Sequence, residues 1–227
     1  MSRLILIYCL FFVAKTQATP MAPDTTTPRF TYLALGDSYT IGEDVPEEQR
    51  YPVQTVTLLA DSGITIDGPR IIARTGWTTD ELEAAIRAEE VRDTFSVVTL
   101  LIGVNNQYRG RSVQEYKVEF TRLLKQAIQF AGGHSDRVVV LSIPDWSRVP
   151  FAEGRNRQEI AEDIDAFNTA NKAIARKYKV HYLDITADSR KADHDITLVA
   201  GDGLHYSGKE MAIWAGKLAA IFRNILH

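Results

Sequence analysis

The sequence predicts an α/β fold, a three-layer α/β/α sandwich in which a parallel five-stranded sheet lies between two layers of helices. Short β-type runs alternate with helical patterns along the 227 residues. Two of these runs, residues 97–102 and 138–141, are nearly unbroken apolar stretches, which is typical of strands covered on both faces. Because 45% of the residues are hydrophobic, a chain of this length can bury one substantial core, and we expect one domain.

The first 18 residues differ in kind from the rest. Arg3 precedes an apolar run over residues 4–14, and Thr16-Gln17-Ala18 supplies small residues at a cleavage-site spacing. We expect residues 1–18 to be a secretory signal peptide and the protein to be periplasmic or extracellular. A membrane anchor is the alternative, but the run is well short of the roughly 20 residues that cross a bilayer.

Cleavage after Ala18 would change what the mature chain contains. It would remove Cys9, the only cysteine, so that stability must come from the core rather than from disulfides. It would also remove Arg3 and Lys15, which moves the formal charge from −3 to −5 and argues against nucleic acid or anionic membranes as partners. Residues 19–29, rich in Thr and Pro, are expected to be a flexible tether before a folded domain over residues 30–227.

The body of the chain divides into ten expected elements. The β-type runs are residues 32–35, 70–73, 96–102, 137–143 and 180–185. The helical patterns are residues 52–61, 79–90, 113–131, 157–178 and 208–226. Capping boxes are expected at three helix starts: Thr78 with Glu81, Ser112 with Glu115, and Ser207 with Glu210. Since ligands of open parallel sheets bind beyond the carboxyl ends of the strands, functional residues are expected just after each run.

Three candidate residues follow the first three strands. Ser38, in Gly36-Asp37-Ser38, can present its hydroxyl as a nucleophile, although a lone serine of this kind more often caps a helix. Gly76 can bring its backbone N–H close to a substrate oxygen, or simply form a turn. Asn105 can donate its amide hydrogen in the same crevice, or serve the local backbone as many turn asparagines do.

A fourth motif, Asp202-Gly203-Leu204-His205, stands just before the last helix. Its spacing lets Asp202 bond Nδ1 of His205, which leaves Nε2 free to take a proton from a serine. Together the four segments supply a nucleophile, oxyanion donors, a base and its orienting carboxylate. These are the parts that acyl transfer requires, and no cofactor or metal is needed.

In order and spacing, these motifs resemble the blocks of the GDSL or SGNH hydrolases, over about residues 32–206. The resemblance implies a flavodoxin-like fold and a serine esterase acting on a small-molecule, lipid or acetylated-sugar ester. It also implies a catalytic triad and an oxyanion hole: Ser38, His205 and Asp202, with the N–H groups of Ser38 and Gly76 and the side chain of Asn105. One departure is Asn106, where the family usually has Asp, and this puts the local loop geometry in doubt.

Other functions are compatible with parts of the pattern. An elbow-type α/β-hydrolase needs Gly-x-Ser-x-Gly, which neither Ser38 nor any other serine satisfies. A metal site could use residues 193–195 with Asp202 and His205, but it leaves the other motifs unexplained. A non-catalytic carbohydrate-binding protein of the same fold remains an alternative, as does a lysophospholipase or thioesterase using the same mechanism.

Aromatic residues follow the fourth strand. Trp146 and Phe151 lie where they could wall an acyl or sugar pocket, and packing in the core is an equally good interpretation. Trp77 has a similar place after the second strand. None of these residues identifies the substrate.

Overall fold

The computed structural model describes residues 29–227; the expected signal peptide and all but the last residue of the expected tether lie outside this range. Its main sheet has five parallel strands in the order β4-β2-β5-β6-β7. The strands are β2 (Tyr32–Gly36), β4 (Arg70–Ala73), β5 (Val97–Leu101), β6 (Val138–Leu141) and β7 (His181–Leu183). All five coincide with predicted β runs, so the parallel five-stranded sheet is confirmed.

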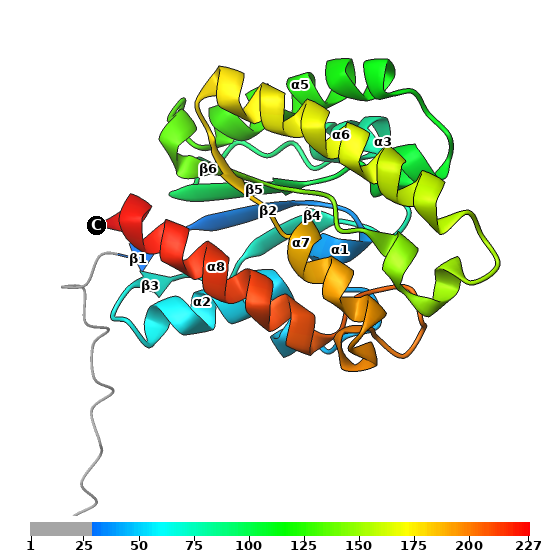
Figure 1. Cartoon of the computed structure of the whole chain (residues 1–227). Helices are drawn as coiled ribbons and strands as arrows, with labels where there is room; N and C mark the ends of the chain where they lie inside the picture. Colours follow the sequence, from blue (N-terminus) through cyan, green and yellow to red (C-terminus); the bar gives the residue numbers. More distant parts are fainter. Residues whose placement is uncertain (1–28) are drawn as a thin grey trace, which may run out of the picture.

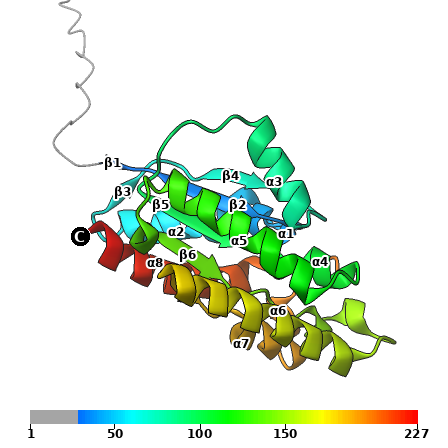
Figure 2. The same cartoon turned by 90° about the horizontal axis from the view of Figure 1, so that it is seen from above.

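Helices cover both faces of this sheet, as predicted (Figure 1). One layer contains α3 (Thr79–Ala88), α5 (Val113–Phe130) and α6 (Arg157–Tyr178), with α5 between the other two in Figure 2. The other layer is built mainly of α2 (Tyr51–Ala60) and α8 (Gly208–Leu226), which pack closely against each other. The ends of these five helices fall within two residues of the predicted ones, because each carries a clear apolar face.

The central strands are buried along their whole length. Every residue of β5 is buried, including Thr99, whose hydroxyl lies 2.9 Å from the hydroxyl of Tyr32. This bond satisfies two polar groups inside an otherwise apolar layer, where an unpaired hydroxyl would be costly. The apolar runs therefore form strands because helices on both sides shield them from water.

Several short elements were not predicted. These are the helices α1 (Ser38–Ile41), α4 (Val104–Tyr108) and α7 (Thr186–Ser189), and a small parallel pair of β1 (Arg29–Phe30) with β3 (Thr65–Ile66). Six 3₁₀ turns accompany them: Glu47–Gln49, Ser135–Arg137, Trp146–Arg148, Pro150–Ala152, Arg190–Asp193 and Ile196–Leu198. Elements of two to five residues are too short to show a helical or strand periodicity. Arg29, expected in the tether, lies in β1 and pairs with Asp67.

The three predicted capping boxes have different outcomes. At α3 the backbone N–H of Thr78 donates to the Glu81 carboxylate at 2.9 Å, and at α5 the Ser112 hydroxyl accepts from the Glu115 N–H at 3.1 Å. The prediction at α8 was wrong, because the Ser207 hydroxyl donates instead to the Thr197 carbonyl at 2.7 Å. The Ser207 hydroxyl therefore bonds a carbonyl that the fold brings close to it, and it does not cap α8.

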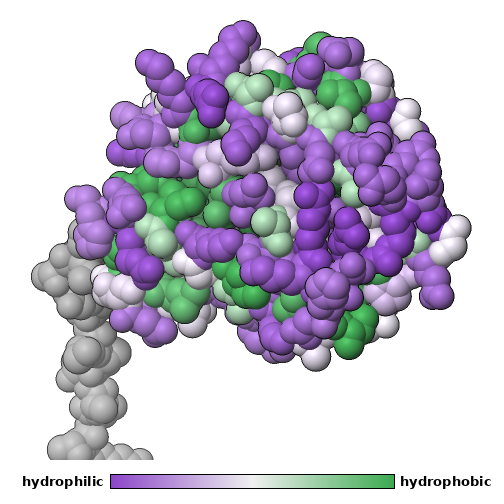
Figure 3. Space-filling model, in the orientation of Figure 1, coloured by the Kyte–Doolittle hydropathy of each residue, from purple (hydrophilic) through white to green (hydrophobic). Residues whose placement is uncertain are grey.

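None of the helices between residues 29 and 227 combines the length and the apolar character that crossing a membrane requires. The face shown in Figure 3 is mostly hydrophilic, and its apolar side chains form small separated patches.

Candidate functional site

Ser38 is the first residue of α1, directly after β2. The carboxylate of Asp37 caps this short helix by accepting from the Tyr39 N–H at 3.1 Å. Ser38 is therefore not the helix cap that its sequence context allowed. Gly36 is required here, because a Cβ at this position would lie 2.5 Å from the Leu101 carbonyl oxygen. The tight junction of β2 and α1 thus fixes where the Ser38 hydroxyl lies.

Asp37 is itself unusual, since it is fully buried at the start of α1. Burial raises the pKa of its carboxyl to about 7, against the opposing effect of the backbone hydrogen bond from Tyr39. One of its oxygens, Oδ2, has no hydrogen-bond partner among the described residues. The buried Asp37 carboxylate precedes Ser38 in the sequence and caps α1, the short helix that begins with Ser38.

His205 and Asp202 contact each other in the loop before α8. The distance between Nδ1 of His205 and Oδ2 of Asp202 is 2.5 Å. The second carboxylate oxygen, Oδ1, accepts from the N–H groups of Leu204 and His205, each at 2.9 Å. Partial burial raises the pKa of Asp202, but these hydrogen bonds outweigh it and hold the pKa below its usual value. An ionised Asp202 favours a proton on Nδ1, so that Nε2 is free to accept one.

Ser38, His205 and Asn105 line one cavity of about 160 Å³. Ser38 follows β2 and Asn105 follows β5, so the cavity lies beyond the carboxyl ends of neighbouring strands, as expected for an open parallel sheet. The ring of Tyr39 packs edge-on against the imidazole of His205, with centroids 5.8 Å apart. The structure therefore brings three of the predicted site residues together.

Gly76 and Asn105 meet around the turn that follows β4. Asn105 Nδ2 donates to the Trp77 carbonyl at 2.9 Å, and its amide has a second N–H to give. Gly76 has a φ of +87°, a conformation that glycine adopts without strain. Gly76 is not among the residues that line the cavity.

Arg109, which was not among the predicted site residues, also contacts this turn. Its guanidinium donates to the Gly76 carbonyl at 2.7 Å and to Glu81 at 3.1 Å. Arg109, the C-cap of α4, lies one turn after Asn105, so this short helix and its cap hold both carbonyls of the Gly76–Trp77 turn. A lone arginine at the end of an unpredicted helix gives no sequence signal for this role.

Asn106, the departure from the family pattern, has a defined role in the structure. Its buried side chain accepts from the Thr79 N–H at 3.1 Å and donates to the Thr79 hydroxyl at 2.7 Å. That hydroxyl in turn donates to the carboxylate of Glu119. Since the hydroxyl has one hydrogen and gives it to Glu119, residue 106 must supply a donor. Asparagine can do so, whereas an ionised aspartate cannot.

We therefore expect Asn106→Asp to lower the free energy of unfolding by about 1–3 kcal/mol, because two carboxylates would compete for one hydrogen. Urea unfolding followed by circular dichroism measures this change. Adding Glu119→Gln should restore most of the loss, since the glutamine amide can then donate to Thr79. An Asn106→Asp variant as stable as the wild type would contradict this explanation.

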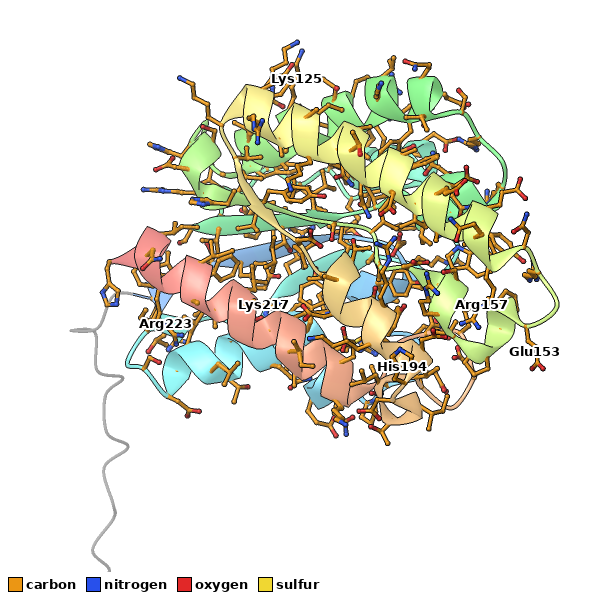
Figure 4. The ribbon with its side chains drawn as sticks, in the orientation of Figure 1. Lys125, Glu153, Arg157, His194, Lys217 and Arg223 are labelled. Carbon is orange, nitrogen blue, oxygen red and sulfur yellow. The ribbon has the colours of Figure 1, made fainter. Side chains whose placement is uncertain are left out.

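The carboxylates of residues 193–195, considered above as metal ligands, have cationic partners instead. Asp193 pairs at 2.7 Å with Arg157, which lies at the start of α6 in Figure 4. Asp195 pairs at 2.8 Å with Lys209, and this hydrogen bond is the main cause that lowers the pKa of Asp195 to about 2. Between residues 29 and 227, no three His, Cys, Asp or Glu side chains are grouped so as to hold a metal ion.

Comparison with known families identifies the chain. The profile of the GDSL-like Lipase/Acylhydrolase family matches residues 34–212, which include Ser38, Gly76, Asn105, Asp202 and His205. The chain belongs to this family. Membership of the GDSL-like lipase/acylhydrolase family, together with the esterases among the similar structures, makes the protein a hydrolase that acts on ester bonds.

Solved structures show the same GDSL fold at low sequence identity. TesA is 17% identical with a TM-score of 0.67, covering 86% of this chain and 99% of its own. The acetylxylan esterase Axe2 from Geobacillus stearothermophilus is 18% identical with a TM-score of 0.65, covering 85% and 93%. The psychrotrophic esterase EstA from Pseudoalteromonas sp., in a structure inhibited by monoethylphosphonate, is 17% identical with a TM-score of 0.63, covering 86% and 98%. No curated protein matches the chain in sequence.

Proposed function

We propose that the protein is a serine esterase in which Ser38 is the nucleophile, His205 the general base and Asp202 the carboxylate that orients it. The observation that carries this proposal is the 2.5 Å contact between Asp202 Oδ2 and His205 Nδ1, in a loop that places His205 in the same cavity as Ser38. A base whose Nδ1 is held by a carboxylate presents Nε2 to a neighbouring hydroxyl.

The reaction proceeds in two steps through an acyl-enzyme. Ser38 Oγ forms a bond with the ester carbonyl carbon while its proton passes to Nε2 of His205, and that proton then goes to the departing alcohol as the ester C–O bond breaks. Water next attacks the acyl carbon and gives its proton to His205, which returns it to Ser38 as the carboxylic acid leaves. The N–H of Ser38 and the free amide hydrogen of Asn105, two residues that line the cavity, stabilise the oxyanion in both steps. The third donor expected from the sequence, the N–H of Gly76, belongs to a residue outside the cavity lining, so we do not assign it this role.

We also propose that the protein is exported. The apolar run of residues 4–14, preceded by Arg3 and followed by Thr16-Gln17-Ala18, supports cleavage after Ala18. The mature chain then contains every residue assigned to the reaction. It has no cysteine, so it is insensitive to the redox state of the compartment that receives it.

A fluorophosphonate probe tests the proposed nucleophile directly, because it forms a covalent bond with an activated serine. We expect one probe per molecule, located at Ser38 by peptide mass mapping, and no labelling of Ser38→Ala. Ser62→Ala, which changes a serine two residues after α2, is the matched control and should label like the wild type. Absence of labelling would favour the alternative that the protein is a non-catalytic binding protein. A label on another serine would show that Ser38 is not the nucleophile.

A further inference from the structure

One side of the cavity beside Ser38 is formed by three aromatic rings, those of Tyr108, Trp146 and Phe151, which we call the aromatic wall. The rings of Tyr108 and Trp146 meet edge to face with centroids 5.5 Å apart, and those of Trp146 and Phe151 are 6.0 Å apart. Val104 and Leu204 add further apolar surface. The polar side chains of the cavity are the proposed catalytic groups and two tyrosines, so most of its lining is carbon.

The aromatic wall is anchored from behind by a chain of hydrogen bonds. The indole Nε1–H of Trp146 donates to Oε1 of Gln107 at 2.9 Å, and the Gln107 amide donates to Asp163 at 3.3 Å. Trp146 is buried, and its one polar hydrogen is already used within the protein. It therefore offers the cavity an apolar surface and no donor for a sugar hydroxyl.

Arg155 holds the outer part of the wall. Its guanidinium lies 4.6 Å from the ring centroid of Phe151, and 5.5 and 5.7 Å from those of Trp146 and Tyr108. Phe151 and Tyr108 are 37% and 49% exposed, so the cation–π contacts fix rings that solvent alone would leave free to turn. Arg155 also lines a separate polar groove that shares Tyr108 and Trp146 with the cavity. The wall thus divides an apolar cavity from a polar groove.

The size of the cavity limits what it can hold. Its volume of about 160 Å³ is close to that of an apolar protein cavity of about 150 Å³ that binds benzene, which has six carbon atoms. An acetyl group would leave most of the apolar lining without contact, and each further methylene that the cavity buries should strengthen binding about fourfold. An acyl chain of ten or more carbons would have to pass the wall.

We propose that this cavity is the acyl subsite and that the enzyme prefers esters of acids with about four to six carbons, with Phe151 and Arg155 setting the limit. The proposal rests on the proposed function, since it places the acyl group on Ser38. Arg155 is a positioning residue, because it acts through the rings of the wall and contacts them from outside the cavity.

A series of p-nitrophenyl esters from acetyl to dodecanoyl tests the preference through kcat/KM. We expect the maximum at butanoyl or hexanoyl, with acetyl at least about tenfold lower and dodecanoyl lower still. A maximum at acetyl, or at decanoyl and beyond, would overturn the proposal. Butanoyl esters of methyl, butyl and hexyl alcohols form the second series, and selectivity for alcohol length in place of acyl length would assign the cavity to the leaving group.

Variants of the aromatic wall test which residues set the preference for acyl length. Phe151→Ala should open the outer end, move the maximum by two or more carbons and raise the ratio of decanoyl to butanoyl activity about tenfold. Arg155→Gln should shift the profile in the same direction by less, and Arg155→Lys should restore it because it keeps the cation. Val118→Ala, at an exposed position on α5, is the control and should leave the profile unchanged. An unaltered profile in both Phe151→Ala and Arg155→Gln would remove these residues from the acyl subsite.

Fluorophosphonate labelling distinguishes a failure of the acyl-subsite proposal from a failure of the proposed function. A wild type that labels at Ser38, yet shows its maximum outside butanoyl to hexanoyl, overturns the acyl subsite alone. Loss of labelling in the wild type overturns the proposed function and the subsite with it.

Discussion

Replacing Ser38 by Ala is expected to lower kcat for a p-nitrophenyl ester by about 10⁴- to 10⁶-fold, with KM changed much less. The variant loses the atom that forms the acyl-enzyme, and the remaining rate comes from binding and from the oxyanion donors alone. The fold should survive the change, because Asp37 and not Ser38 caps α1, and because the serine side chain is small. Steady-state kinetics on the purified variant measures the loss.

Two controls make this result interpretable. The melting temperature of Ser38→Ala should stay close to that of the wild type, which excludes unfolding as the cause. Release of p-nitrophenol in a burst before the steady state should occur in the wild type where deacylation is slower than acylation, and never in the variant. Turnover by Ser38→Ala within tenfold of the wild type would show that another group carries the reaction.

The larger elements of the fold were predictable because they depend on periodicity. The runs at residues 97–102 and 138–141 contain mostly apolar residues and became β5 and β6, which are buried on both faces. The longer helices carry apolar faces that reach the core, and their ends were predicted within two residues. Position after a strand also indicated where Ser38 and Asn105 would lie, since parallel strands deliver their ends to one edge of the sheet.

Contacts decided by tertiary neighbours could not be predicted in the same way. Ser207 has the same local pattern as Thr78, yet its hydroxyl bonds Thr197, and only the fold brings that carbonyl close. Asparagine is favoured at position 106 because the Thr79 hydroxyl donates to Glu119, which belongs to another helix. The pKa of Asp37 depends on complete burial, which follows from packing around α1. In each case the deciding contact or burial arises from packing in the folded structure, for which the local sequence pattern carries no signal.

The second large effect is expected at Asp202, where Asp202→Asn should lower kcat about 10⁴-fold while KM changes little. The backbone geometry dictates how the new side chain must lie. Oδ1 accepts from the N–H groups of Leu204 and His205, so the amide oxygen has to occupy that position. The amide NH₂ then faces Nδ1 of His205, which becomes an acceptor, and the ring proton moves to Nε2. A protonated Nε2 cannot take the proton of Ser38.

Asp44→Asn provides the matched control for this substitution. Among residues 29–227, the Asp44 side chain accepts one hydrogen bond, from the backbone N–H of Asp202 at 2.8 Å, and an asparagine oxygen can do the same. Its φ of +58° is a conformation that asparagine tolerates as well as aspartate. We therefore expect Asp44→Asn to keep kcat within about threefold of the wild type, since an exposed asparagine that keeps the hydrogen bond to the Asp202 N–H changes little. If Asp202→Asn behaved like Asp44→Asn, the 2.5 Å contact would be structural, and the carboxylate would have no part in orienting the base.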